Sequence, residues 1–428
     1  MDRRAFLIMA LAGAADSGSG PSAPSAPQGM AAAPEPAALS ADPAFEAWSR
    51  EFVGRAILSG LPAEVVTREM TGLAPDSRVV ALDSRQPEFA KPISDYIKGV
   101  VTDERIALGR RKADAIAALP RIEADYGVPR EVLVSIWAVE TAFGSLQGDF
   151  DVIRSLATLA ASGRRRDWAE EQLIAAIRIV ADGEATRGQL RGSWAGAMGQ
   201  TQFEPYTYLT MAVDGDGDGR RDVWGSSADA LASAGNLLTR AGWLRGQRWD
   251  REVVLPPGFD YSLTEGPRQD AAAWAALGVM PAAGGGWATA DAASQAQLLL
   301  PTGAAGPAFL AFDNHFVIRK YNNSTAYALA VGLLADRIGG APPLATPWPH
   351  EDPLSLADRT AAQSALARLG YPPGALDGVI GANTRAALRQ WQKAKGLPAD
   401  GYLSLDVVRR LQAEVPTAAD APPPQGAS

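Results

Sequence analysis

The chain of 428 residues is long enough for two or three domains, and its net charge of −8 excludes a nucleic-acid binder that works by broad phosphate neutralisation. It contains no cysteine, which excludes disulfides, thiolate nucleophiles and cysteine-ligated zinc. Two histidines, His315 and His350, leave almost nothing from which to build a Ser-His-Asp hydrolase or a multi-histidine metal site. Any chemistry must therefore rest on carboxylates, hydroxyls and amides, and we expect no organic cofactor and no nucleic-acid partner.

The first 15 residues (1–15), MDRRAFLIMALAGAA, combine a short basic region, an apolar run and small residues, which is the layout of a secretory signal peptide. The arginine pair in RRAFL resembles the twin-arginine export signal. The apolar run is too short to cross a bilayer, and no cysteine follows it that could carry a lipid. We therefore expect an exported protein of the periplasm with no membrane anchor; a frayed apolar N-terminus on a cytoplasmic protein is the alternative.

Residues 16–41, rich in Ala, Pro, Ser and Gly, predict a disordered linker.

Residues 42–338 are predicted to form one globular, mainly helical domain. One helical stripe is formed by Ile153, Leu156 and Leu159. The stretch SIWAVETAFG predicts a helix that begins near Pro129 and stops near Gly144, with an apolar side made of Val132, Ile136, Val139 and Phe143. Residues 251–318 instead show short apolar runs separated by Gly and Pro, which predict a small β-containing insertion. A last helix, STAYALAVGLLADRI, closes the domain.

Glu140 falls on the apolar side of its helix, where a leucine would be expected. Burying an ionised acid without a partner is costly, so such a carboxyl group is paired, protonated or catalytic. One interpretation is an ion pair with an arginine of the segment 164–166. The other is a general acid, because a carboxyl group in an apolar setting has a raised pKa and can stay protonated near neutral pH, as cleavage of a glycosidic bond requires. The helical pattern leaves both interpretations open.

Two segments combine amide and hydroxyl groups with aromatic rings, a mixture that suits a saccharide, which has apolar faces and a polar rim. The first, GSWAGAMGQTQFEP, supplies Ser193, Trp194, Gln200, Gln202 and Phe203. The second, RKYNNSTAY, supplies Tyr321, Asn322 and Tyr327. Each has a structural alternative: a tight helix-packing loop for the first, and for the second an N-cap of the last helix, at Asn323 or Ser324.

The run DGDGDGRRD begins like an EF-hand calcium loop, in which alternate carboxylates converge because a glycine at position 6 allows a sharp turn. Here those carboxylates belong to Asp214, Asp216 and Asp218. Position 12 is Gly225 in place of the usual Glu, so a calcium site would need a wider loop that reaches Asp229. The pattern predicts a structural calcium ion; a solvated Asp-Gly turn is the alternative.

The C-terminal part of the chain divides into three stretches. Residues 339–353 contain five prolines and predict a stiff, extended linker. Residues 354–413 show three short helical patterns joined by glycine-rich turns, which predict a separate domain. Residues 414–428 are predicted to be a disordered tail.

Taken in order, several segments closely resemble the membrane-bound lytic murein transglycosylase B family: YGVPREVLVSIWAVETAFG, LATLAASGRRRDW, RGSWAGAMGQTQFEPYTYLTMAVDGDGDGRRDVW, SADALASAGNLL and YNNSTAYALAVGLL. The stretch LGYPPGALDGVIGANTRAALRQWQKAKGLPADGYLSLDVVRRL resembles the widespread three-helix peptidoglycan-binding domain. The resemblance implies a mainly α fold: a lysozyme-like α-helical catalytic domain with a small β-containing insertion, and a three-helix C-terminal domain. It implies peptidoglycan glycan strands as the partner, whereas the sequence identifies no protein partner.

The resemblance also implies cleavage of the β-1,4 bond between N-acetylmuramic acid and N-acetylglucosamine. It places the single catalytic acid at Glu140, which would protonate the glycosidic oxygen while the substrate's N-acetyl group stabilises the cation. The carboxylate would then take the proton of the muramic acid 6-hydroxyl, so that this hydroxyl closes on the anomeric carbon as a 1,6-anhydro product. No second carboxylate is needed. A muramidase that hydrolyses the same bond and a catalytically silent peptidoglycan-binding protein are the alternatives.

Site residues follow from the same resemblance. It assigns to the saccharide cleft Ser193, Gln202, Phe203, Tyr321, Asn322, Tyr327, Arg165 and Arg166. It assigns to calcium the carboxylates of Asp214, Asp216, Asp218 and Asp229 and the carbonyl oxygen of Arg220. The chain departs from the family at two places: Glu204 is an additional acid, because QFEPY stands where QFMPS is common, and Asp229 lies one residue later than in familiar members.

Overall fold

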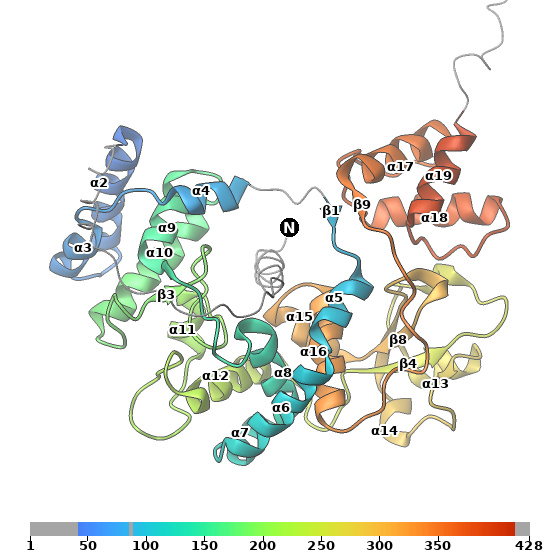
Figure 1. Cartoon of the computed structure of the whole chain (residues 1–428), viewed down its shortest axis with the longest axis horizontal. Helices are drawn as coiled ribbons and strands as arrows, with labels where there is room; N and C mark the ends of the chain where they lie inside the picture. The colour runs from blue at the N-terminus through green and yellow to red at the C-terminus, as the bar shows by residue number, and fades with distance from the viewer. Residues whose placement is uncertain (1–41, 85–88, 416–428) are drawn as a thin grey trace, which may run out of the picture. The chain divides into compact units, whose positions relative to one another are not determined.

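The computed structural model describes residues 42–84 and 89–415, in which helices predominate (Figure 1). The predicted signal peptide and the linker 16–41 lie outside the described residues, as does nearly all of the tail 414–428. Among the helices that are described, none combines the length and the apolar character that crossing a membrane requires. The predicted mainly α fold is confirmed.

The chain forms two compact units, each made of two stretches of sequence. Of the described residues, the first unit contains 42–84 and Leu108–Ala241, and the second contains 89–107 and 242–415. The helices α2 to α4 and α7 to α12 belong to the first unit: Pro43–Leu58, Ala63–Met70, Ser77–Ser84, Leu119–Tyr126, Arg130–Thr141, Val152–Ala161, Arg166–Ala181, Pro205–Met211 and Ser227–Arg240. Helix α6 (Asp103–Ala115) continues from the second unit into the first.

Helices α9 and α10 pack along each other in the first unit. On α9 the predicted stripe of Ile153, Leu156 and Leu159 is buried, which confirms the prediction made from its period. Asp151 caps this helix, because its carboxylate accepts the N–H of Arg154 at 3.0 Å. Two short strands, β2 (Phe150–Asp151) and β3 (Arg191–Gly192), pair antiparallel beside it.

Helix α8 carries Glu140 through the interior of the first unit, since nearly all of its residues are buried. It begins directly after Pro129, which lies at the N-cap position, and it ends at Thr141. Ala142, Phe143 and Gly144 then adopt positive φ angles of 48°, 61° and 83°. Two non-glycine residues in the left-handed region are costly, so this turn is held by its surroundings.

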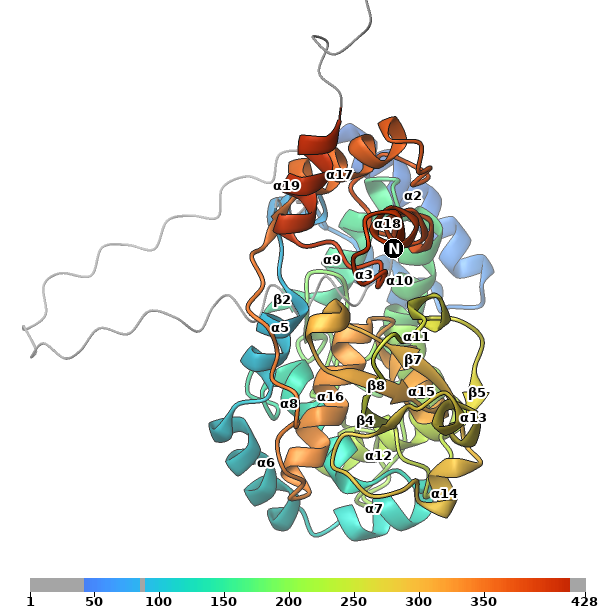
Figure 2. The ribbon, with the colours of Figure 1, turned by 90° about the vertical axis from the view of Figure 1, so that its right-hand side faces the viewer.

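The second unit contains a five-stranded antiparallel sheet in the order β5-β7-β8-β4-β6, whose central strands lie side by side in Figure 2. The strands β4 to β8 are Asp250–Val254, Gln269–Asp270, Met280–Pro281, Gln295–Leu299 and Ala308–Ala311. Its core is built around Trp274, Leu310 and Phe312. Helices α5 and α13 to α16 accompany the sheet: Ile93–Val100, Ala271–Ala276, Thr289–Ala292, Asp313–Tyr321 and Thr325–Ile338. The predicted β-containing insertion is therefore confirmed.

Three helices, α17 (Leu356–Arg368), α18 (Ala382–Ala394) and α19 (Leu405–Glu414), surround the fully buried ring of Trp391. They confirm the three helical patterns predicted for this part of the chain. Strand β9 (Leu354–Ser355) precedes them and pairs with β1 (Phe89–Ala90). The preceding proline-rich segment contains no helix or strand, yet it is fastened to the sheet of the same unit, since the N–H groups of its residues 345 and 346 donate to the carboxylate of Glu252 at 2.8 and 2.7 Å.

His315 on α15 is buried, and neither of its ring nitrogens has a hydrogen-bond partner among the described residues. Burial, assisted by repulsion from Arg319 and Arg268, lowers the pKa of His315 from 6.5 to about 3. Below pH 6.5 the unfolded chain therefore binds a proton that the folded chain does not bind. It follows that the free energy of unfolding falls as the pH falls from 6.5 towards 3.

We predict that His315→Phe removes this acid sensitivity. Between pH 7.5 and pH 5, protonation of this histidine in the unfolded chain should lower the free energy of unfolding of wild type by about 2 kcal/mol. The variant lacks the histidine and should not show this decrease. Urea denaturation at the two pH values, followed by tryptophan fluorescence, measures the difference. His350→Gln is the matched control, because it changes the other histidine, whose side chain is 89% exposed. The same pH dependence in wild type and His315→Phe would contradict the prediction.

Candidate active site

Glu140 lies in the last turn of α8 and is 6% exposed, so the prediction of an acid on a buried helix face is confirmed. The arginines offered as its ion-pair partners have contacts of their own. Arg164 and Arg165 both bond the carboxylate of Asp83, at 3.1 and 2.6 Å. The guanidinium of Arg166 donates to the carbonyl oxygen of Ala160 at 3.4 Å. These contacts engage the segment 164–166 with α4 and α9.

Thr141, the last residue of α8, forms a hydrogen bond to the segment that follows β3. Its buried hydroxyl donates to the carbonyl oxygen of Gln200 at 2.6 Å and accepts the N–H of Gly144 at 2.9 Å. The first bond crosses 59 positions of sequence, and the second closes the left-handed turn. A side chain at Gly144 would place its Cβ 2.7 Å from Oε1 of Gln200. The residue next to Glu140 therefore fixes this segment against α8.

We predict that Thr141→Val lowers kcat by about tenfold, because valine keeps the shape of threonine but leaves the half-buried N–H of Gly144 and the buried C=O of Gln200 without their partner. Thr141→Ser keeps the hydroxyl and should restore most of the rate. Steady-state kinetics of both variants, with their melting temperatures, measure the effect. A Thr141→Ser variant as slow as Thr141→Val would show that packing, and not the hydroxyl, is responsible.

Several hydrogen bonds within and around the segment after β3 define its conformation. Met198 forms bridges with Gly192 and Phe203, and the hydroxyl of Ser193 accepts the N–H of Ala197 at 3.0 Å. Gln202 has a φ of 53°, and its side-chain amide donates to the carbonyl oxygens of Gln147 and Gly199, both at 3.1 Å. These bonds hold Ser193, Gln202 and the buried Phe203 in one structured segment.

Small residues in this segment serve close packing, so the packing interpretation also holds. A Cβ at Gly196 would lie 2.7 Å from the side chain of Leu156, and one at Gly199 would lie 2.8 Å from Val223. Trp194 of this segment lies near a predicted arginine, because the Arg165 guanidinium is 5.5 Å from its ring centroid; the same guanidinium is 5.1 Å from the ring centroid of Trp168 on α10. Close packing and exchange of internal hydrogen bonds are therefore features of one segment.

The second unit carries the other predicted saccharide residues. The rings of Tyr321 and Tyr327 stack with centroids 6.4 Å apart. Ser324 caps α16 by accepting the N–H of Tyr327 at 3.3 Å, which confirms one of the two predicted caps. Between these residues Asn322 is buried, and neither atom of its side-chain amide has a hydrogen-bond partner among the described residues. A buried amide without partners is rare in proteins and fits a group that bonds a ligand.

Four carboxylates converge at the N-terminal end of α12. Ligand oxygens of Asp214, Asp216, Asp218 and Asp229 all lie within 4.8 Å of one another. Two oxygens bound to the same Ca²⁺ lie at most about 5.2 Å apart, since each is 2.3–2.6 Å from the ion. The donor set therefore fits calcium. The structure brings together all four predicted carboxylates; it provides no test of the Arg220 carbonyl.

Backbone N–H groups donate to the carboxylates of the loop and shape it. The Asp214 carboxylate accepts the N–H groups of Gly217 and Gly219 at 2.5 and 2.8 Å, and these bonds hold the pKa of Asp214 below its usual value. Asp229 is buried and accepts the N–H groups of residues 215, 216 and 222 at 2.7, 3.2 and 2.7 Å. Burial raises the pKa of Asp229, because nearby carboxylates and desolvation both disfavour its charge.

Two contributors to this site were missed in the sequence. Thr141 could have been suspected, because a threonine in the last turn of a buried helix needs a hydrogen-bond partner. Asp83, the partner of two arginines, gave no local signal because it lies more than 80 positions away from them. Glu204 lies at the N-cap position of α11 and its side chain makes no capping bond.

The chain belongs to the Transglycosylase SLT domain family, whose model matches residues 44–336. Residues 355–411 match the model of a peptidoglycan binding domain. These matches confirm the predicted family resemblance.

The relatives agree with this assignment. The membrane-bound lytic murein transglycosylase B of Escherichia coli is 34% identical over 225 residues, which are 52% of this chain and 60% of that protein. The structure of SltB3 from Pseudomonas aeruginosa in complex with NAG-anhNAM-pentapeptide is 47% identical, with a TM-score of 0.82 over 86% of this chain and 99% of that chain. The Escherichia coli lytic transglycosylase Slt35 in complex with calcium is 27% identical, with a TM-score of 0.59 over 68% of this chain and 92% of that chain. The predicted lysozyme-like fold is thereby confirmed.

Proposed function

We propose that this chain is a lytic transglycosylase that cleaves the β-1,4 bond between N-acetylmuramic acid and N-acetylglucosamine in peptidoglycan. The observation that carries the proposal is the buried side chain of Glu140 in a chain of this family, next to Thr141, whose hydroxyl holds the segment after β3 against α8. The complex of SltB3 with NAG-anhNAM-pentapeptide supports the 1,6-anhydro product.

Glu140 performs both proton transfers. Protonated, it gives its proton to the glycosidic oxygen, and the bond from that oxygen to the anomeric carbon breaks with its electron pair leaving on the oxygen. The resulting carboxylate takes the proton from the muramic acid 6-hydroxyl, whose oxygen then bonds the anomeric carbon. The acid is regenerated, no water is consumed, and no second carboxylate is required.

Saccharide contacts are assigned to both units. In the first unit they are Ser193, Gln202, Phe203, Arg165 and Arg166. In the second unit they are Tyr321, Asn322 and Tyr327, and the unpaired amide of Asn322 supports its assignment because an N-acetyl group offers both a donor and an acceptor.

The ion is proposed to be calcium, held by the carboxylates of Asp214, Asp216, Asp218 and Asp229 with the carbonyl oxygen of Arg220. Its role is structural, since it would neutralise acids that otherwise repel one another. The chemistry of the donor set and the calcium complex of Slt35 support this choice.

The proposed organisation follows the predicted boundaries. Residues 1–15 direct export to the periplasm, residues 42–338 act on the glycan, and residues 354–413 hold the enzyme on the cell wall. The match of residues 355–411 to a peptidoglycan binding domain supports the last assignment.

Digestion of purified sacculi tests the reaction. We expect muropeptides one water lighter than the products of hydrolysis, with no new reducing ends. Reducing muramic acid ends would instead identify a muramidase that hydrolyses the bond. Binding to sacculi without soluble products would identify a catalytically silent wall-binding protein.

A further inference from the structure

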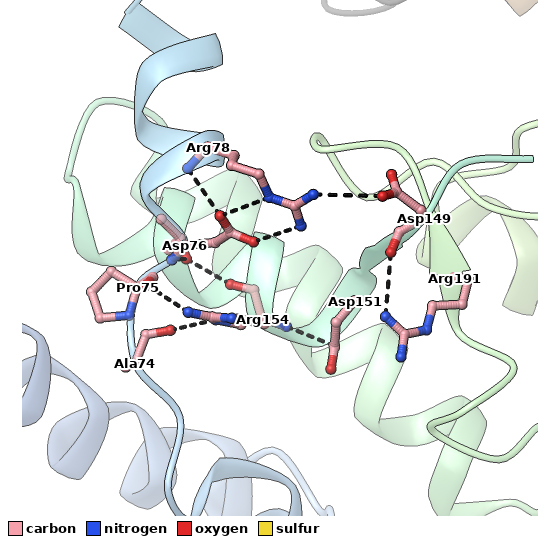
Figure 3. Close-up of polar contacts among 9 residues, drawn as sticks. Ala74, Pro75, Asp76, Arg78, Asp149, Asp151, Arg154 and Arg191 are labelled. Atoms are coloured by element: carbon pink, nitrogen blue, oxygen red, sulfur yellow. Dashed lines mark hydrogen bonds and ion pairs between the residues drawn. The ribbon is translucent and has the colours of Figure 1, made fainter. Parts of the chain in front are cut away.

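Two arginines from separate elements meet at the start of β2 (Figure 3). Arg78 lies in the first turn of α4, and its Nη1 is 3.5 Å from Oδ2 of Asp149. Arg191 lies in β3, and its Nη1 donates to the backbone oxygen of the same Asp149 at 3.3 Å. The side chain of Arg78 is 57% exposed and that of Asp149 is 80% exposed, so water reaches this cluster.

Arg78 is held in place by two neighbours. The buried Asp76 accepts from its Nη2 at 3.1 Å and also caps the start of α4 by accepting the N–H of Arg78 at 2.9 Å. The guanidinium lies 4.3 Å from the ring centroid of Phe150. A guanidinium fixed in this way loses little freedom when it binds a further group, and its Nη1 faces the exposed Asp149 carboxylate.

The cluster adjoins the segment assigned to the saccharide. Phe150 is opposite Gly192 in the ladder of β2 and β3, and Ser193 follows directly. The backbones are close here, since a Cβ at Gly148 would lie 2.1 Å from the oxygen of Gly192 and 2.9 Å from the nitrogen of Ser193. Asp149 is therefore one residue away from backbone that contacts Ser193.

We propose that Arg78 and Arg191 bind a carboxylate of the peptide substituent on the glycan strand; this inference rests on the proposed function. The sugar rings offer hydroxyls and amides, whereas the peptide substituent carries the free carboxylates that an arginine fork recognises. The Asp149 carboxylate occupies Nη1 of Arg78 until the substrate arrives, and its exposed side chain then swings away; Arg191 donates to the backbone oxygen of Asp149, so this movement leaves its hydrogen bond in place. The cluster makes the enzyme prefer strands whose peptides are charged.

Binding of two matched strands tests the inference. The ligands are soluble glycan oligomers with peptides whose carboxylates are either free or converted to amides, and the protein is the full chain with Glu140→Gln, so that no turnover occurs. Calorimetry should show that the free-carboxylate strand binds several times more tightly. Adding Arg78→Gln or Arg191→Gln should weaken binding of that strand about fivefold and reduce the preference. Asp149→Asn should increase the preference, because it removes the competing negative charge.

Arg68→Gln is the matched control. Arg68 is 61% exposed and pairs with the buried acid Glu69, as Arg78 pairs with the buried Asp76. Its substitution should leave the preference for the free-carboxylate strand unchanged. Equal binding of the two strands by the parent protein, or an equal loss for both strands in Arg78→Gln, would overturn the inference. The proposed function is tested separately by product release. If wild type bound the strands but released no anhydro product, the proposed function would be wrong.

Discussion

Glu140→Gln is expected to lower the release of anhydro muropeptides from sacculi by roughly a thousandfold. The amide has the size of the carboxyl group, yet it can neither give a proton to the glycosidic oxygen nor take one from the 6-hydroxyl. Both proton transfers rest on this one residue, so no other acid rescues the second step. Product analysis by mass over a time course measures the loss, and the melting temperature of the variant verifies that it is folded.

Glu204→Gln is the matched control for Glu140→Gln. Glu204 lies on the same unit, is half-buried and makes no capping bond at the start of α11. Its substitution should keep the rate of anhydro product release within about threefold of wild type. If Glu140→Gln retained a tenth of the wild-type rate or more, the assignment of the single acid would be wrong. If Glu204→Gln removed a fraction of hydrolysed product, Glu204 would be the residue that activates water.

Local patterns predicted the parts of the site that depend on sequence neighbours. The helical stripe around Glu140 placed the acid correctly, because helix periodicity needs no knowledge of the rest of the chain. The Asp-Gly run placed three carboxylates for the same reason, since a glycine-rich turn folds on itself. The partner of Arg165 could not be predicted in this way, because Asp83 is 82 positions distant and is brought near by the packing of α4 on α9.

The fold shows the same division between local and distant information. The N-cap at Ser324 could be predicted from neighbouring residues. The strand order in the second unit could not, because β4 pairs with both β6 and β8, which follow it at different distances along the chain. The proline-rich segment was expected to be an extended linker from its composition alone. Its attachment to Glu252 requires a bond across 93 positions, and composition carries no information about such a bond.

Calcium is expected to stabilise wild type, because four carboxylates within 4.8 Å of one another repel when no ion neutralises them. At a calcium concentration a hundredfold above Kd, the free energy of unfolding should rise by about 2.7 kcal/mol relative to chelated protein. Asp216→Ala removes an exposed ligand and should abolish most of this increment. Asp114→Ala, which removes an exposed acid of the same unit outside the cluster, should keep it. Melting curves with calcium and with chelator, after removal of carried-over metal, measure the effect.

Asp229 should behave differently from Asp216 when calcium is absent. Its buried carboxylate accepts three backbone N–H groups, so Asp229→Ala leaves these donors without a partner and should cost roughly 2–4 kcal/mol even in chelator. Asp216→Ala relieves repulsion and should leave the chelated protein as stable as wild type or slightly more so. Opposite effects in chelator, together with loss of the calcium increment in both variants, would separate the acid that shapes the loop from the acid that binds the ion. No calcium-dependent shift in wild type would instead leave the cluster as a solvated Asp-Gly turn.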